Sequence, residues 1–261
     1  MISDGMADVL RSLRQGRRDD PARECAQALG AEGVALSLLV GFGRTAEPLW
    51  GHPEVSARFE ELQFTLGEGP GPDAVLTGTP VLEPDLESVR PERWPVLLPS
   101  ARELGVHGVC CFPLGIGAIR VGVLTVLCDA KRTMTEQQCV DATALAASLT
   151  GTFLNRDGPG NPGADGNGGA APGWFLERPT GLHRASVHQA TGMISVQLGV
   201  PVAEAILRLR AHAYSSERPL SEVADDVVAR RLRFNDNDND ASDGGFDGDT
   251  NGPYSPDGGK G

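Results

Sequence analysis

The fold of the C-terminal part of this chain is decided by residues 183–234, HRASVHQATGMISVQLGVPVAEAILRLRAHAYSSERPLSEVADDVVARRLRF. Apolar residues recur there at steps of three and four, which places them on one face of each of three successive α-helices. The three stripes are Val187, Ala190, Ile194 and Leu198, then Val202, Ala205, Ile206, Leu209 and Ala213, and finally Val223, Ala224, Val227, Val228 and Leu232. Short amphipathic helices with short links predict a small all-α bundle of three helices.

The limits of these helices follow from residues that start or stop a helix. Gly199 is expected to end the first helix and Pro201 to open the second, because proline suits a first helical position. Residues 215–219 separate the second helix from the third. Ser221 is expected to cap the third helix, since a serine hydroxyl can accept a hydrogen bond from a free backbone N–H at a helix start.

Three blocks of this stretch, QATGMI, LRLRAHA and LSEVADDVV, resemble in order and spacing the ANTAR module of bacterial antiterminators. The resemblance covers essentially all of 183–234. It implies RNA binding, since members of that family bind paired hairpin loops in nascent leader RNA and thereby suppress a terminator. Many members carry a lysine just before the glycine of the first block, whereas this chain has Thr191, which offers a phosphate no positive charge.

Residues of this module that lie off the apolar stripes are the candidates for RNA contact. Arginine can meet a phosphate or stack on a splayed base, and tyrosine and histidine can also stack. The alternative for each of them is an ordinary solvated side chain. The candidates are His188, Gln189, Thr191, Gly192, Arg208, Arg210, His212 and Tyr214, of which Thr191, Gly192 and Arg210 stand inside the matching blocks.

Charge is unevenly distributed along the 261 residues, whose net charge is -12. Residues 177–234 hold eight arginines against six acidic residues, whereas residues 235–261 hold one lysine against seven aspartates. Nucleic-acid binding depends on locally clustered positive charge rather than on the charge of the whole chain. With so small an excess of arginine, the module would owe its RNA affinity to shape, stacking and two copies acting together, which predicts a homodimer.

The sequence before residue 155 predicts helices and strands in alternation. Helices are expected over 6–13, 21–29, 53–62, 96–104 and 136–154 and after Pro72, and strands over 34–42, 48–51, 105–117 and 118–129 and before Leu86. Asp19 or Asp20 is expected to cap the helix at 21–29, and Thr135 the helix at 136–154. The last helix is expected to turn one apolar side inward, formed by Val140, Thr143, Ala144, Ala147 and Leu154. This order predicts an α/β (α+β) domain whose antiparallel sheet is flanked by helices.

The run LGEGPGPDAVLTGTPVLEPDL, followed by RWP and by GVHGVCCFPLGIGAIRVGVLTV, resembles the GAF domains that actinobacterial regulators join to an ANTAR module. The resemblance covers about 25–155. It implies a sensory or dimerising domain with a pocket for a small-molecule ligand between the sheet and its covering loops. The glycine-rich segment 67–71 is interpreted as a turn that lines this pocket, because it lacks the GK[ST] of a phosphate-binding loop.

Composition divides the chain into five parts. Residues 1–24 form an N-terminal helical segment, and 25–155 form the GAF-like domain. Residues 156–176 are expected to be a flexible linker, because glycine, proline and polar residues cannot bury enough apolar surface to order themselves. Residues 177–234 form the ANTAR-like domain, and 235–261 form an acidic tail that is expected to be disordered.

The sequence carries no pattern that predicts catalysis, a cofactor or a metal. Its five cysteines contain no CxxC pair, which is typical of reduced thiols in a cytoplasmic protein, and no apolar run approaches the length of a membrane span. Cys110 and Cys111 stand side by side in a predicted strand and should point to opposite faces. No third cysteine stands at a spacing that indicates a resolving thiol, so buried structural cysteines are the favoured reading. The five histidines show no spacing typical of a metal site.

Three hypotheses for the function remain open. The first is a sensor-regulated antitermination protein that binds RNA as a dimer. The second is a DNA-binding regulator, because LSEVADDVV resembles the opening of a helix-turn-helix, although no basic recognition helix follows it. The third is a GAF-fold enzyme that uses a thiol, for which the sequence lacks a catalytic constellation. We therefore predict a regulator and not an enzyme.

Overall fold

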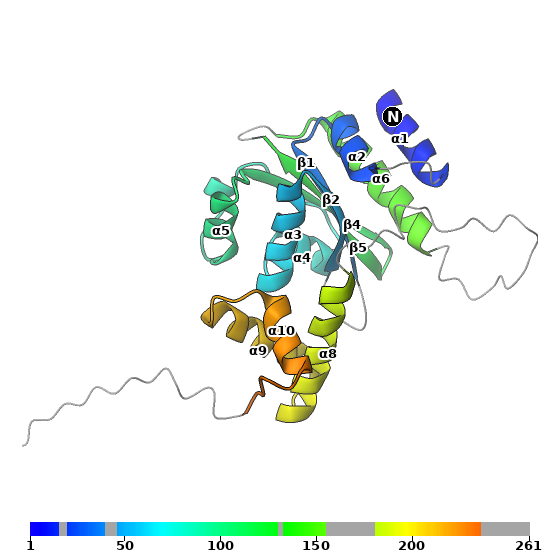
Figure 1. Cartoon of the computed structure of the whole chain (residues 1–261). Coiled ribbons are helices and arrows are strands. Elements are labelled where there is room, and N and C mark those ends of the chain that lie inside the picture. Colours follow the sequence, from blue (N-terminus) through cyan, green and yellow to red (C-terminus); the bar gives the residue numbers. More distant parts are fainter. Residues whose placement is uncertain (16–19, 40–45, 130–132, 155–180, 236–261) are drawn as a thin grey trace, which may run out of the picture. The chain divides into compact units, whose positions relative to one another are not determined.

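The computed structural model describes residues 1–15, 20–39, 46–129, 133–154 and 181–235 (Figure 1). The chain divides into two compact units, residues 1–185 and residues 186–261. The linker predicted over 156–176 and the predicted tail from residue 236 onward lie outside the described residues.

The first unit is built on a five-stranded sheet with the strand order β2-β1-β5-β4-β3. Its strands are β1 (Gly33–Leu39), β2 (Ala46–His52), β3 (Val81–Glu83), β4 (Gly108–Ile116) and β5 (Ile119–Cys128). Every neighbouring pair is antiparallel. The predicted antiparallel sheet is therefore confirmed, including the tight β4–β5 turn at Gly117, whose φ of +60° suits glycine.

Helices cover both faces of the sheet (Figure 1). One face packs against α1 (Asp4–Gln15), α2 (Pro21–Leu29) and α6 (Glu136–Leu154), and the other against α3 (Glu54–Leu66), α4 (Pro70–Thr77) and α5 (Leu97–Glu103). Because side chains alternate along a strand, the long strands β4 and β5 supply both cores. Cys110 lies in the first core and the adjacent Cys111 in the second, as predicted.

Local capping signals in the sequence are confirmed. Asp20 accepts a hydrogen bond from the backbone N–H of Arg23 (3.0 Å) at the start of α2. The Thr135 hydroxyl accepts from the Gln138 N–H (3.2 Å), and the Gln138 side chain accepts from the Thr135 N–H (2.8 Å). This reciprocal pair is a capping box, which satisfies two backbone donors at the start of α6.

The predicted inward side of α6 is wrong. Val140 is 37% exposed, and Thr143 and Ala147 are also exposed. The buried side instead consists of Asp141, Ala142, Leu145, Ala146, Leu149, Thr150 and Phe153. The helix carries small or apolar residues on nearly every side, so the periodicity of the sequence did not determine which face became buried. Contacts with α1 and α2 did, since Asp141 accepts from the Ser3 N–H (2.9 Å) and the Gln138 amide donates to the Leu29 carbonyl (2.7 Å).

The glycine-rich segment 67–71 is packed between α3 and α5. The Glu68 carboxylate accepts from the N–H groups of Val96 (2.8 Å) and Leu97 (2.7 Å), and the Gln63 side chain accepts from the Gly71 N–H (2.8 Å). The neighbouring core is filled by fully buried side chains such as Phe59 and Trp94. The segment therefore joins helices, and it does not line the groove between α3 and α5 or the cavity between α2, β5 and α6.

The second unit contains α8 (Gly181–Leu198), α9 (Val202–Ser215) and α10 (Leu220–Val228). Gly199, with a φ of +65°, follows the end of α8 as predicted. The predicted Ser221 cap is wrong, because α10 already begins at Leu220 and its N-cap, Pro219, has no side chain that can accept a hydrogen bond. Of the helices described, none is by itself long and apolar enough to span a membrane, and α8 and α9 meet that criterion only as a pair bent by 107°.

Candidate nucleic-acid interface

The apolar stripes of α8, α9 and α10 form the core of the three-helix unit. Its buried residues are Val187, Ala190, Ile194, Ala205, Leu209, Ala213, Leu220, Val223, Ala224, Val227 and Phe234. Among the positions predicted to face inward, Val202 alone is exposed, at 61%. It stands in the first turn of α9. Since one face of each helix is buried in this core, a partner can contact α8 and α9 only on their outward faces.

The outer face of α8 carries three of the predicted candidates. His188, Gln189 and Gly192 are exposed, and Val196 continues the same face one turn later at 84% exposure. Gly192 stands in the helix interior, where glycine costs about 0.5–1 kcal/mol relative to alanine. A Cβ atom added there would meet no described atom within 4 Å, so packing within the unit does not require glycine. A partner that approaches the α8 backbone closely would require it.

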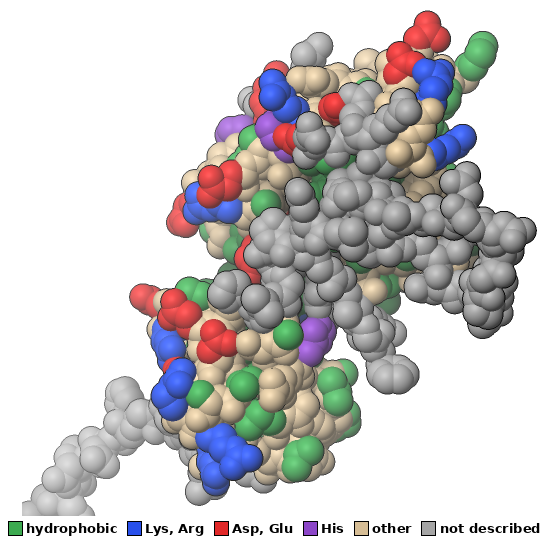
Figure 2. All heavy atoms as spheres, turned by 45° about the vertical axis from the view of Figure 1, so that its right-hand side comes forward, with side chains coloured by type: hydrophobic (Ala, Val, Ile, Leu, Met, Phe, Trp, Pro, Cys, Tyr) green, Lys and Arg blue, Asp and Glu red, His purple; other side chains and the backbone are tan. Residues whose placement is uncertain are grey.

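The outer face of α9 is apolar and aromatic. Leu207 and Tyr214 are 59% and 62% exposed, and Ala203 and Ala211, at helical spacing from them, are exposed as well. An exposed tyrosine next to small apolar residues offers a flat surface on which a base can stack. Figure 2 shows hydrophobic and basic side chains exposed on this unit.

Two predicted candidates are not surface residues. Thr191 is 3% exposed, and its hydroxyl donates to the Val187 carbonyl one turn earlier (2.6 Å), so it belongs to the core side of α8. Arg210 is half-buried rather than clear of the apolar stripe, and burial lowers the pKa of its guanidinium to about 10. Arg210 remains protonated at neutral pH, but its stem is part of the packed unit.

Arg208 and His212 have partners inside the unit. Arg208 forms an ion pair with Glu204 one turn earlier on α9 (2.9 Å). The ring of His212 packs edge-on against the ring of Phe234. The structure therefore brings His188, Gln189 and Gly192 together on one face, leaves Tyr214 on the outer face of α9, and gives the remaining candidates structural contacts.

Arginines after α10 are candidates that the stripe argument missed. Arg230, Arg231 and Arg233 are all exposed. Arg231 and Arg218 both hydrogen-bond to the Asp226 carboxylate (2.7 Å each), and these bonds lower the pKa of Asp226. Arg230 and Arg233 have no acidic partner within the part of the chain that the structure describes. The signal in the sequence was the run RRLR, which places unpaired cations where phosphates can reach them.

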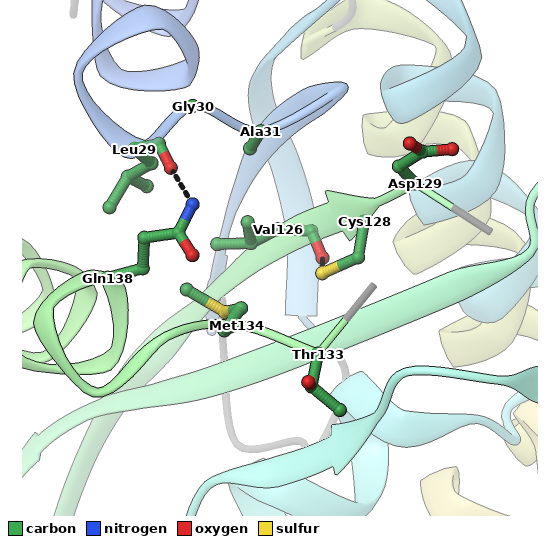
Figure 3. Close-up of a pocket in the computed structure, with 9 residues that line it drawn as sticks. All are labelled: Leu29, Gly30, Ala31, Val126, Cys128, Asp129, Thr133, Met134 and Gln138. Atoms are coloured by element: carbon green, nitrogen blue, oxygen red, sulfur yellow. Dashed lines mark hydrogen bonds between the residues drawn. The ribbon is translucent and has the colours of Figure 1, made fainter. Parts of the chain in front are cut away.

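Two cavities of the first unit are lined by described residues throughout. A groove of about 600 Å³ between α3 and α5 is lined by Arg58, Glu61, Leu62, Thr65, Ser100, Glu103 and Leu104. A smaller cavity lies where α2 and β5 end and α6 begins (Figure 3). No group of three or more His, Cys, Asp or Glu side chains that could hold a metal ion occurs in the described ranges.

Residues 182–228 match a family model of the ANTAR domain. No curated protein sequence matches the chain. Solved structures similar to the first unit include the GAF domain of a phosphoenolpyruvate-protein phosphotransferase from Coxiella burnetii, at 16% identity, with 59% of this chain and 96% of that chain covered and a TM-score of 0.43. The corresponding GAF domain from Acinetobacter has 17% identity, coverage of 59% and 96%, and a TM-score of 0.44. A free methionine-R-sulfoxide reductase from Neisseria meningitidis, solved with its substrate, has 18% identity, coverage of 59% and 93%, and a TM-score of 0.40.

The three-helix unit is thus an ANTAR domain, the kind of module known for RNA binding and antitermination. The chain joins it to the α/β unit with the five-stranded antiparallel sheet.

Proposed function

We propose that this protein is an antitermination regulator that binds hairpin loops of nascent leader RNA as a homodimer in the cytoplasm. The observation that carries the proposal is the outer face of α8 in the ANTAR domain, where His188 and Gln189 flank a helix-interior glycine that the fold itself does not need. A glycine at such a place lets RNA backbone or a base edge approach the helix, while the two side chains supply hydrogen bonds.

Two further features support RNA as the partner. Tyr214 on α9 offers a stacking surface for an unpaired base, and Arg230 and Arg233 offer cations for phosphates. None of these side chains lies on a continuous basic helix of the kind that enters the major groove of DNA. Loops, whose bases are splayed and accessible, suit this mixture of stacking and few charges better than a duplex does.

Dimerisation is proposed because the charge of one ANTAR domain is small. Two copies that each bind one hairpin convert the second contact into an intramolecular event, which raises the overall affinity without any new contact. The ligand that controls the protein is proposed to be a small molecule in the groove between α3 and α5, whose volume lies within the range usual for ligand sites.

The test uses the full-length protein and three nucleic acids of equal length: an RNA with two closely spaced hairpins, an RNA with one hairpin, and duplex DNA. The two-hairpin RNA should bind at least about tenfold more tightly than the single hairpin, as expected for bivalent binding. The duplex DNA should bind weakest. Crosslinking to cellular RNA should recover fragments that fold into paired hairpins ahead of a terminator. Preference for the duplex DNA would instead favour a DNA-binding regulator.

A further inference from the structure

Strand pairing in the first unit brings two cysteines into contact that lie 18 residues apart in the sequence. Cys110 in β4 and Cys128 in β5 point to the same face of the sheet, and their Sγ atoms are 3.7 Å apart. Spacing in the sequence did not indicate this contact, because strand pairing and not chain distance brings the two sulfurs together. Cys110 pairs directly with Val126, so the contact with Cys128 is the diagonal one across an antiparallel pair.

One of the two thiols, Cys128, faces the cavity at the start of α6. Cys128, the last residue of β5, lines the cavity between α2, β5 and α6 together with Gly30, Met134 and Gln138 (Figure 3). The cavity volume is about 40 Å³. Since a water-sized group occupies roughly 10–15 Å³, the cavity has room for two or three such groups. Cys110 is 2% exposed and does not line this cavity.

The two thiols are also chemically unequal. Their mutual hydrogen bond lowers the pKa of Cys128, in opposition to the effect of burial. The same hydrogen bond, followed by burial, raises the pKa of Cys110. The thiolate is the nucleophilic form of cysteine, so the sulfur that faces the cavity is also the more reactive one.

We propose that Cys110 and Cys128 form a redox-active dithiol site, which a small hydroperoxide oxidises through the cavity at Cys128 to give an intramolecular disulfide. A hydroperoxide of two or three heavy atoms is of a size that the cavity can hold. With this site, the α/β unit would act as a sensor of small hydroperoxides. This role does not depend on the RNA binding proposed for the ANTAR domain.

The reaction balances in two steps. The Cys128 thiolate attacks one peroxide oxygen, the O–O bond breaks, and the leaving oxygen takes a proton to become water or an alcohol, which leaves Cys128 as a sulfenic acid. The Cys110 sulfur then attacks the Cys128 sulfur, the S–O bond breaks, and the departing hydroxide leaves as water with the Cys110 proton. Two thiols lose two electrons and the peroxide gains them. The sulfurs must approach from 3.7 Å to about 2.0 Å.

The experiment treats the reduced full-length protein with hydrogen peroxide, unfolds it, blocks the remaining thiols and digests it with trypsin. Cys110 and Cys111 fall in the peptide 103–120, and Cys128 falls in 121–131, so the expected product is a crosslink between these two peptides that a reductant reverses. The matched control is Cys111→Ala, which removes the neighbouring thiol on the opposite face and should leave the crosslink intact. Cys110→Ala should abolish the crosslink and leave a sulfenic acid on Cys128 that dimedone traps.

Cys128→Ala should abolish both the crosslink and the sulfenic acid that dimedone traps, because the sulfur that faces the cavity is then absent. The proposal is overturned if Cys139, the least buried cysteine, or the Met134 thioether is oxidised while Cys110 and Cys128 stay reduced. It is also overturned if the Cys110→Ala variant still forms the crosslink between the two peptides, because Cys111 would then be the partner of Cys128. The peptide map of the natural sequence decides the question even where an alanine variant does not fold.

Discussion

The rings of His212 and Phe234 meet edge-on, with 5.4 Å between their centroids and 64° between their planes. Phe234 lies beyond the end of α10, and its backbone N–H donates to the Gln197 side chain on α8 (3.0 Å). The residue that follows the third helix thus contacts both other helices of the ANTAR domain. Phe234 is 7% exposed, so its side chain belongs to the buried core of this domain.

We expect Phe234→Ala to destabilise the ANTAR domain by about 3 kcal/mol, the usual cost of truncating a buried phenylalanine. Hydrogen exchange of the peptides from 181–235 measures this in the full chain. Val202→Ala is the control, since Val202 is exposed and its truncation should change the free energy of unfolding by less than about 0.5 kcal/mol. Equal effects of both variants would contradict the assigned core.

Gly192→Ala should separate stability from binding. The added methyl group has open space, so the helix should gain about 0.5–1 kcal/mol in stability. If RNA approaches the backbone of α8 at this point, affinity should fall roughly tenfold, about 1.4 kcal/mol. Gly151→Ala is matched to it, because Gly151 is also a helix-interior glycine with nothing within 4 Å, but on α6. It should leave the affinity unchanged, and an unaffected Gly192→Ala would remove this face from the interface.

The arginines after α10 should act through phosphates. Replacement of both Arg230 and Arg233 by alanine should weaken binding to every RNA alike and reduce the slope of log affinity against log salt by about 1–2. Titrations at several salt concentrations give the slope. Arg102→Ala on α5 makes the same kind of charge change in the other unit and should leave the slope as it was. A loss confined to one RNA sequence would point to base contacts instead.

Deletion of residues 236–261 should leave the melting midpoint nearly unchanged, because the segment has few apolar residues to bury. The seven aspartates lie within it and can compete with phosphate for the arginines, so the deletion should also strengthen non-specific RNA binding at low salt. Calorimetry and binding to an unrelated RNA test the two halves of this prediction. A clearly lowered midpoint would show that the segment docks on one of the units.

Insertions near Gly166 should have a shallow effect on antitermination. A glycine-rich tether transmits no torque, and doubling its length should lower the effective concentration about threefold, roughly 0.6 kcal/mol. A continuous signalling helix would instead turn the ANTAR domain by about 100° for each inserted residue. A reporter assay on insertions of one to four residues distinguishes the two, because a response that oscillates with the helical period contradicts the tether.

Local patterns were enough to predict most elements of both units. The repeats at three- and four-residue spacing predicted α8, α9 and α10, and the β-branched runs predicted β1, β4 and β5. The capping signals at Asp20 and Thr135 were correct as well, because a cap is a contact between residues two or three positions apart. Contacts of this range depend on neighbours in the chain and are therefore readable from it.

The tertiary structure alone decided which side of a helix became buried where both sides were eligible. The spacing argument predicted that Val140 and Ala147 on α6 face the core. Leu145 and Leu149 face it instead, and the side of α6 that carries them is also the side that contacts α2. Thr191 and Arg210 were predicted to contact RNA because they lie off the apolar stripes and inside the matching blocks. Thr191 is instead buried, with its hydroxyl donating to the Val187 carbonyl, and Arg210 is half-buried.

The contact between Cys110 and Cys128 could not have been read from spacing either. It depends on the register in which β4 and β5 pair, which sets Gly108 opposite Cys128 and so places the two sulfurs on one face, one strand apart. The alternation within each strand was predictable, because it is a property of the backbone. The register of β4 against β5 was not predictable, because packing of the whole sheet against its two cores determines it. A slip of one residue would have turned one of the two thiols to the opposite face.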